Sequence, residues 1–319
     1  MATNYISSTL ADYTAADPTK VLEDYLLEGV GTKDHWSYRT GVKFQTKIAN
    51  IANVDVDIST GAIGGYNTAS GGVTMTDVTL VNKQLKIFEV YTQETLNQTI
   101  LGSLAKGTDP KELPLKDQIY GLKGRKTFIE NEKLMWQADT STTVQTAGTT
   151  LNSFDGILAQ LRTGAGAKGN SAVSLQTLSD ASTLEHIGSL VTQMETAKPE
   201  YIGNPTVMAM SPANFAKYSR ALYALNGTVT TATLGADGQP INEVYIPGTS
   251  IKVVSTIGLN GKNNIVLSIP QNIIAVYDLV DESDSLNFIE NPFAHWHELT
   301  GFYKLGSHVV DVSNCIVSE

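Results

Sequence analysis

The side chains best suited to chemistry in this sequence are two histidines near its end. His295 and His297 stand two residues apart, so on a strand they would share one face and could offer two nitrogen ligands to a zinc ion. A zinc site needs further ligands, and no third one follows at a matching spacing. We therefore expect these histidines to flank Trp296 on a half-exposed strand rather than to bind a metal.

A second candidate is an acidic cluster that consists of Asp278, Asp281, Glu282 and Asp284. Such a cluster could attract a divalent cation, because calcium and magnesium prefer oxygen ligands. Its spacing lacks the central glycine and the bidentate glutamate of a calcium loop. We expect a solvated turn at this place.

The remaining chemical patterns are weaker. Gly164, Gly166 and Gly169 match the spacing of a dinucleotide-binding loop, but the flanking residues predict neither the preceding strand nor the following helix that such a loop requires. The single cysteine, Cys315, excludes an internal disulfide, and we expect it to be a small buried residue of a final strand. The sequence thus predicts no catalytic residue, no metal, no cofactor and no enzymatic activity.

Composition and charge also favour a structural role. The chain has 319 residues, enough for a large core, and only 17% of them are charged. That fraction is low beside the roughly 25% of an average soluble protein, and it suits extensive protein contact. The net charge of −10 argues against tight nucleic-acid binding, which needs clustered Lys and Arg. No apolar run approaches the roughly 18 residues of a membrane span, and the N-terminus lacks the features of a signal peptide, so we expect no membrane contact.

A long hairpin is the first element that the sequence predicts clearly. Residues 43–58 end in strict alternation, residues 61–72 hold five glycines, and residues 73–91 return as a second strand. An isolated two-stranded ribbon is marginal in water, so we expect it to lie on another protein, most simply a second copy of this chain. The apolar residues that we expect at this contact are Val54, Val56, Ile58, Tyr66, Val78 and Leu80.

A long amphipathic helix is predicted over residues 115–138. Apolar residues recur mostly at a seven-residue spacing, which is typical of a helix that turns one face to a core. The predicted core face consists of Leu115, Ile119, Leu122, Ile129 and Trp136.

The rest of the sequence mixes helix and strand patterns. Helices are predicted near 18–27, near 181–196 and from Pro212, and strands at 205–210, 250–256 and 264–269. Residues 272–319 carry several runs of strand-type residues and predict a final antiparallel set. The fold class is therefore α+β.

This order of elements resembles the major capsid protein of tailed double-stranded DNA bacteriophages, the Hong Kong 97-like fold. Five segments carry the resemblance: residues 83–102 (KQLKIFEVYTQETLNQTILG), 130–156 (beginning ENEKLMWQAD), 205–222 (PTVMAMSPANFAKYSRAL), 247–259 (PGTSIKVVSTIGL) and 272–310 (beginning NIIAVYDLV). They resemble, in order, the strand that leaves an extended loop, the end of a spine helix, a strand-to-helix unit, a further strand and the returning strands of that family.

The resemblance implies five parts of the chain. These are an N-terminal arm at 1–42, an extended β-hairpin loop (E-loop) at 43–85, a peripheral domain at 86–160 with a spine helix at 115–138, an axial domain at 161–271, and returning strands of the peripheral domain at 272–319.

The resemblance also implies a function. The chain would be a structural subunit of an icosahedral virus shell, self-assembling into homo-pentamers and homo-hexamers that enclose double-stranded DNA without sequence-specific contact. Implied further partners are a separate scaffold, a portal protein and a decoration protein. The implied location is the virion capsid, with assembly in the host-cell cytoplasm. Two alternatives stay open: an encapsulin-like protein nanocompartment, and an unrelated soluble enzyme or β-rich binding protein.

Overall fold

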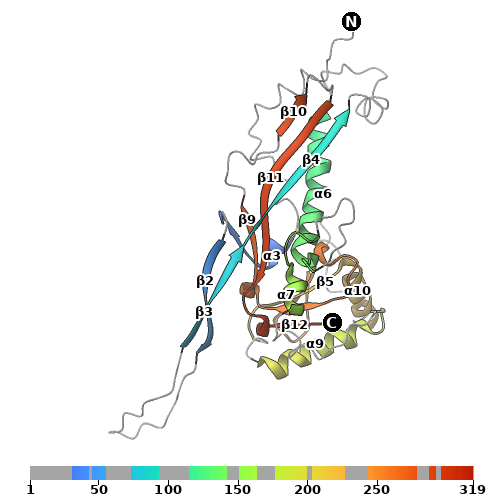
Figure 1. Cartoon of the computed structure of the whole chain (residues 1–319). Helices are drawn as coiled ribbons and strands as arrows, with labels where there is room; N and C mark the ends of the chain where they lie inside the picture. Colours follow the sequence, from blue (N-terminus) through green and yellow to red (C-terminus); the bar gives the residue numbers. More distant parts are fainter. Residues whose placement is uncertain are drawn as a thin grey trace, which may run out of the picture.

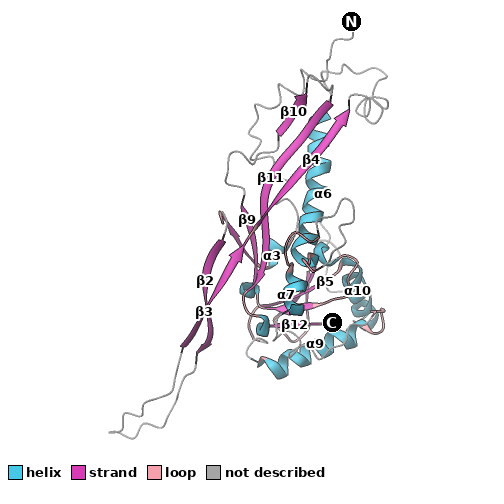
Figure 2. Cartoon of the chain, viewed as in Figure 1, coloured by secondary structure: helices cyan, strands magenta, loops and turns pink. Residues whose placement is uncertain are grey.

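The computed structural model of the chain describes residues 31–42, 45–54, 73–92, 115–141, 151–163, 177–199, 203–226, 243–278, 287–291 and 296–318. This described part contains two five-stranded sheets and a two-stranded ribbon that stands apart from both. Figure 1 shows the ribbon reaching away from the body, and Figure 2 shows helices beside both larger sheets. The fold class is α+β, as predicted.

The first sheet is built around one long strand, β11 (Trp296–Val309). The N-terminal part of β11 pairs antiparallel with β4 (Lys83–Thr92) and β10 (Asn287–Asn291), and its C-terminal part pairs antiparallel with β9 (Ile273–Asp278). At the sheet edge, β1 (Ser37–Thr40) pairs parallel with β9. Segments from both ends of the chain thus meet in one sheet.

The predicted long helix is α6 (Leu115–Gln137), which runs beside β4 and β11 (Figure 1). Trp136 is fully buried, as predicted, and its ring meets that of Trp36 edge to face, with centroids 6.3 Å apart. Ile129 is only half-buried, because the buried stripe near the helix end follows other residues, namely Phe128, Asn131, Glu132 and Met135. Three residues of the predicted core face lie in the helix, but their side chains are outside the described part: Leu115, Ile119 and Leu122.

The second sheet has the strand order β12-β8-β5-β7-β6. Its strands are β5 (Thr206–Met210), β6 (Glu243–Tyr245), β7 (Ile251–Ser255), β8 (Val266–Ser268) and β12 (Cys315–Val317). Strands β5 and β7 are parallel, and the other pairs are antiparallel. Helices α9 (Thr183–Ala197) and α10 (Pro212–Asn226) match the helices predicted near 181–196 and from Pro212.

Strand β5 shows why this sheet forms. All five of its residues are buried, and the four apolar ones alternate between two apolar clusters. Met208 and Met210 join the cluster that contains residues of α9 and α10, whereas Val207 and Ala209 join the cluster that contains Trp136. A central strand that is buried on both faces explains the continuous apolar run predicted at 205–210.

Two segments differ from the predicted division of the chain. The segment 31–42 was predicted as part of the N-terminal arm, but it packs into the body, since Trp36 is buried and β1 adds to the first sheet. The segment 315–317 was predicted among the returning strands, but as β12 it pairs with β8 of the second sheet. In both cases the partner strand is distant in sequence, so the alternation of apolar and polar residues along the segment does not identify it.

The predicted acidic turn also needs a correction. Asp278 is not solvated, because it is buried at the end of β9 and pairs with Lys304 at 3.0 Å. The rest of the acidic cluster lies outside the described residues, as do the helix predicted near 18–27, the glycine pattern at 164–169, and His295. His297 lies on β11, as a strand residue.

Two features are absent from the described residues. Within the ranges given above, no group of three His, Cys, Asp or Glu side chains could hold a metal ion. Likewise, none of the helices in the described part is long and apolar enough to cross a membrane.

Candidate assembly interface

The predicted hairpin is formed by β2 (Gln45–Val54) and β3 (Val73–Val81), which pair antiparallel in a sheet of their own. Above its base, the described side chains of this ribbon are exposed or half-buried. Lys47 and Asp77 pair across it at 3.6 Å, but both are well exposed, so the pair adds little stability. Because the described part of the ribbon buries little surface on its own chain, contact with a partner surface would stabilise it.

The base of the hairpin is fixed by Leu80. This side chain is fully buried and packs with Val42, Ile274 and Val276 of the chain's own body. Leu80 is therefore not available to a neighbouring subunit, and its predicted role at an intersubunit contact is wrong. Alternation places Val78 and Leu80 on one face but does not reveal that this face meets the body, where Val78 is half-buried against the same cluster.

The other contacts predicted on the hairpin stay predictions. Val54 ends β2, but its side chain is outside the described part. Three further residues fall on the segment 55–72, which is also outside it: Val56, Ile58 and Tyr66. The register of the described ribbon shifts between Ile51 and Asn53, which indicates a bulge toward its far end.

Polar contacts hold the junction between the hairpin and the body. Asn82, directly after β3, is buried, and its amide donates to the carbonyl of Val42. On β11, Nε2 of His308 lies 2.7 Å from both the backbone nitrogen and the carbonyl oxygen of Val81. Gly306 lies against the same carbonyl, since a Cβ at this position would be 2.5 Å from it. Sequence patterns did not point to these residues, because each acts on a segment far away in the chain.

Strand β4 has one face toward the core and one toward solvent. Leu85 is buried in the core, and Glu89 pairs with Lys123 of α6 at 2.5 Å. On the opposite face, Phe88 and Val90 are 50% and 43% exposed. Exposed apolar side chains of this size, side by side, are typical of a contact with another protein.

The exposed apolar surface continues onto β11. Phe302 lies opposite Lys86 in the register of β4 and β11 and is half-buried. The ammonium group of Lys86 lies over the rings of Phe88 and Phe302, 4.4 and 5.8 Å from their centroids. We call Phe88, Val90 and Phe302 the outer-sheet patch.

More exposed apolar side chains occur around the second sheet. Tyr223 and Leu225 are mostly exposed near the end of α10, and Tyr245 is mostly exposed on β6. Strand β6 is at the edge of its sheet, where unpaired backbone groups can also meet another chain. These residues are further candidates for contact between copies.

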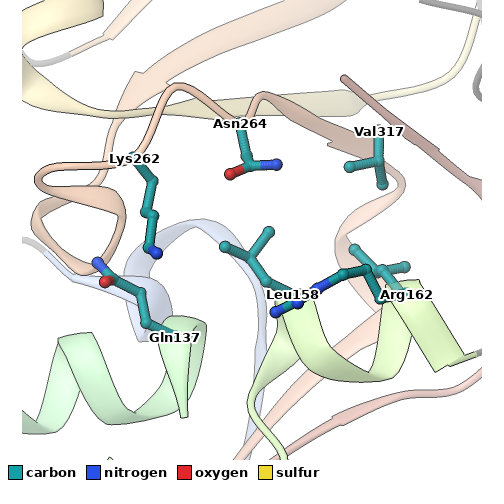
Figure 3. A pocket seen from close by; sticks show the side chains of 7 residues that line it. Gln137, Leu158, Arg162, Lys262, Asn264 and Val317 are labelled. Atoms are coloured by element: carbon teal, nitrogen blue, oxygen red, sulfur yellow. The ribbon is translucent and has the colours of Figure 1, made fainter. Parts of the chain in front are cut away.

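A pocket of about 230 Å³ lies where α6 ends (Figure 3). Its lining comes from α6, α7 (Ile157–Thr163), the turn before β8, and β12: Gln137, Leu158, Leu161, Arg162, Lys262, Asn264 and Val317. The amide of Gln137 donates to the carbonyls of Gly258 and Asn260 at 2.5 and 3.0 Å, and that of Asn264 donates to the carbonyl of Ser318 at 3.0 Å. These amides therefore connect α6 and the end of β12 to the turns between β7 and β8. Their hydrogen bonds stabilise the fold.

Three buried ionisable groups of the described part are also engaged within the chain. Burial raises the pKa of the Cys315 thiol to about 12, so the thiol stays protonated and unreactive in β12, which confirms its predicted structural role. His186 shares a hydrogen bond of 2.8 Å with the hydroxyl of Ser318, and burial lowers the pKa of this histidine. Glu132 is buried on α6 and accepts hydrogen bonds from Thr32. Contacts of this kind favour a structural role.

Comparison with solved structures identifies the fold. The chain is similar to a chain of the satellite phage P4 procapsid that includes the size determination protein, with a TM-score of 0.55, 12% identity, and coverage of 94% of this chain and 98% of that one. It is similar to the capsid of Myoviridae phage XM1, with a TM-score of 0.53, 12% identity, and coverage of 92% and 96%. It is also similar to a virus-like particle from Pyrococcus furiosus, with a TM-score of 0.51, 12% identity, and coverage of 94% and 96%. No protein-family model and no curated protein sequence matches the chain.

These likenesses extend over nearly the whole of each chain rather than over a single domain. Sequence identity is low, so they establish the fold: the chain has the Hong Kong 97-like fold of tailed-phage capsid proteins. The fold implied by the sequence resemblance is confirmed.

Proposed function

We propose that this chain is the structural subunit of a closed icosahedral shell, which its pentamers and hexamers form around double-stranded DNA. The observation that carries the proposal is the whole-chain likeness to a procapsid, a capsid and a virus-like particle, each covering at least 92% of this chain. A fold alone does not define a function, so the proposal also rests on the surfaces of this chain.

The hairpin supports self-assembly. Among the described side chains of the hairpin, those near its base pack on the chain's own body, and the others are exposed or half-buried, which leaves surface that can lie on a neighbour. Permanent assemblies bury roughly 2,000–5,000 Å² per interface, and a projecting ribbon adds such area without a larger core. In the shell, the hairpin residues that contact a neighbour would be Val54, Val56, Ile58 and Tyr66, with Val78 at the margin.

Surfaces that could receive a neighbour are present on the same chain. The outer-sheet patch exposes two large apolar side chains of β4, and Tyr223, Leu225 and Tyr245 expose more around the second sheet. Rings of five and six subunits use head-to-tail contacts, in which one surface of a subunit meets a different surface of the next. Projecting and receiving surfaces on one chain fit that arrangement.

The charge of the subunit fits a container for DNA. At a net charge of −10, the subunit would not bind the enclosed DNA tightly, and a container that later releases its contents needs weak contacts. The proposal includes assembly in the host-cell cytoplasm with a separate scaffold, a portal protein and a decoration protein.

The test is electron microscopy of the purified full-length protein and of particles from its native source, combined with an assay for nuclease-protected DNA. We expect closed shells, with protected DNA in the native particles. Shells that hold a protein and no DNA would favour a nanocompartment, the second candidate, which the likeness to the virus-like particle supports. A chain that stays monomeric in its source and at high concentration in vitro would contradict both.

A further inference from the structure

Val81 is the last residue of the hairpin strand β3. The side chain of His308 contacts its backbone N–H and C=O on the side where a neighbouring strand would form hydrogen bonds. In an antiparallel ladder, the N–H and the C=O of one residue point in the same direction. Both groups of Val81 lie 2.7 Å from Nε2 of His308, so they point away from the partner strand β2. The imidazole of His308 thus links the two-stranded ribbon to the five-stranded sheet.

One ring nitrogen can serve only one of these two groups at a time. When Nε2 carries no proton, it accepts a hydrogen bond from the N–H of Val81. When Nε2 is protonated, as it always is in the imidazolium ion, it donates to the carbonyl of Val81 and leaves the N–H without this acceptor. The contact therefore has two chemically distinct states.

The surroundings hold Val81 in reach of the ring. Leu80 is fully buried beside it, and Asn82 is buried and donates to the carbonyl of Val42. Gly306 allows the backbone of β11 to approach the carbonyl of Val81, because any side chain at this position would collide with it. The neighbouring residues thus fix the position of Val81, and the protonation state of the His308 ring decides which of its two backbone groups is hydrogen-bonded.

We propose that His308 is a proton-dependent clamp at the base of the hairpin, and that its protonation exchanges the hydrogen bond from the N–H of Val81 for one to the carbonyl of Val81, which leaves that N–H without its acceptor. The proposal concerns the single chain and does not rest on the shell function. It predicts that the amide of Val81 is protected from hydrogen exchange near neutral pH and less protected in acid.

In the described part of the chain, the ion pairs on the strands packed around the ring join other side chains and not His308. Burial lowers the pKa of His308, and the carbonyl of Val81 opposes this effect. On the hairpin, Lys47 pairs with Asp77, and across β9 and β11, Asp278 pairs with Lys304. The other charged residues on the neighbouring described elements are Arg39 on β1, Lys83, Lys86 and Glu89 on β4, Glu298 on β11, Arg162 on α7 and Asp311 after β11. The neutral ring is thus the form present above its ordinary pKa of 6.5, and the hydrogen bond from the N–H of Val81 is lost as the pH falls through the lowered value.

The test combines two measurements on the full chain. NMR of nitrogen-labelled histidine gives the tautomer of His308 and the pH at which it titrates. Hydrogen exchange, corrected for the intrinsic effect of pH, gives the protection of the Val81 amide above and below that pH. We expect Nε2 to be unprotonated near neutral pH, and the protection of Val81 to fall about fivefold in acid, as for the loss of one typical backbone hydrogen bond.

Two substitutions of His308 and one control variant test the role of the ring directly. His308→Gln offers an acceptor at every pH, so Val81 should stay protected in acid; His308→Lys offers donors alone, so Val81 should be unprotected at both pH values. His186→Gln changes a histidine that bonds Ser318 instead, and it should keep the wild-type response at Val81. The proposal is overturned if Val81 protection does not change while His308 titrates, or if His308→Gln responds to pH as the wild type does. The comparison of wild type with His308→Gln suffices if His308→Lys does not fold.

Discussion

Thr32 donates two hydrogen bonds to Glu132, across 100 residues of sequence: its backbone N–H to Oε1 at 3.0 Å and its hydroxyl to Oε2 at 2.6 Å. The indole N–H of Trp136 donates to the same hydroxyl at 2.8 Å. A Cβ at Gly31 would come within 2.5 Å of Oε1, so the chain passes very close to the carboxyl group. One buried carboxyl group thus joins α6 to the segment that leads toward the N-terminus.

Replacing Glu132 with Gln should change how stability depends on pH. Burial raises the pKa of Glu132 from 4.5 to about 7, so the folded chain holds a proton that the unfolded chain releases between these values. The wild type should therefore lose stability as the pH rises from 4.5 to about 7, by about 3 kcal/mol at roughly 1.4 kcal/mol per pH unit. Glu132→Gln should remove this loss, and urea unfolding of the unassembled chain at pH 5 and pH 8 measures it.

Glu130→Gln is the matched control for that experiment. Glu130 lies on the same helix, is partly exposed and pairs with Lys133 at 3.0 Å. Its replacement should leave the loss of stability between pH 5 and pH 8 in place, because the buried carboxyl group of Glu132 is retained. An equal pH dependence in the Glu132→Gln variant and the wild type would show that the buried carboxyl group does not carry this proton.

Truncating Trp136 should destabilise the chain far more than truncating Ile129. Trp136→Ala removes a fully buried ring, its edge contact with Trp36 and its hydrogen bond to Thr32, and should cost about 3–5 kcal/mol. Ile129→Ala removes a half-buried side chain of the same helix and should cost about 1 kcal/mol. Similar losses in thermal or urea unfolding would mean that the two residues share one core face, as the seven-residue spacing predicted.

Gly306→Ala should loosen the base of the hairpin. The new methyl group would lie 2.5 Å from the carbonyl oxygen of Val81, so β3 or β11 must shift, at a cost of about 1–3 kcal/mol. Gly188→Ala is a control within α9, where a Cβ meets no atom within 4 Å, and it should stabilise the chain by up to about 1 kcal/mol. Equal stability of the two variants, with unchanged hydrogen exchange at Val81, would contradict the close approach.

Shortening the hairpin should separate folding from assembly. Ile48 pairs with Val78, so residues 49–77 can be replaced by an Asn-Gly turn that keeps the buried Leu80 in place. Circular dichroism and unfolding should show a folded chain, and electron microscopy should show no stable shells. Normal shells from this variant would refute the proposed role of the hairpin.

Placing a charge in the outer-sheet patch should block assembly without unfolding the chain. Phe88→Asp changes a half-exposed side chain, so the cost to the unassembled chain should be about 1 kcal/mol or less. A neighbour packed on the patch would have to bury the new carboxylate, so the yield of shells should fall. Lys83→Asp on the exposed part of β4 is the control, and shells that form equally well with both variants would exclude the patch from the interface.

Sequence predicts those elements in which buried positions recur at the regular spacing of a helix or follow one another in a strand. The run at 205–210 predicted β5 because both faces of that strand are buried, and the helix predicted at 115–138 ends at Gln137 in the structure. A periodic pattern, however, reports which residues share a face and not what that face meets. Val78 and Leu80 were therefore assigned to a neighbour, although Leu80 packs on the chain's own β9.

The contacts that sequence could not predict join residues with no local signal. Glu132 is one of several charged residues on α6, and nothing in the sequence distinguishes it from the exposed ones. It is nevertheless buried, and Thr32 of a distant segment donates a hydrogen bond to it. His308 reads as an ordinary strand residue, and its role depends on the position of Val81, which lies 227 residues away. Pairing across such distances is set by the completed fold rather than by neighbouring residues.

The direct passage from β3 into β4 has a mechanical consequence. Strand β4 begins two residues after Val81 and pairs with β11 along its whole length, from Lys83 opposite Leu305 to Thr92 opposite Trp296. In Figure 1, β3 and β4 follow nearly one line, so a pull on the hairpin would slide β4 along β11. In that geometry the hydrogen bonds between the two strands share the force, instead of breaking one after another as in a zipper. A pull on the ribbon would therefore reach the centre of the first sheet as shear stress, the loading that a ladder of this kind resists best.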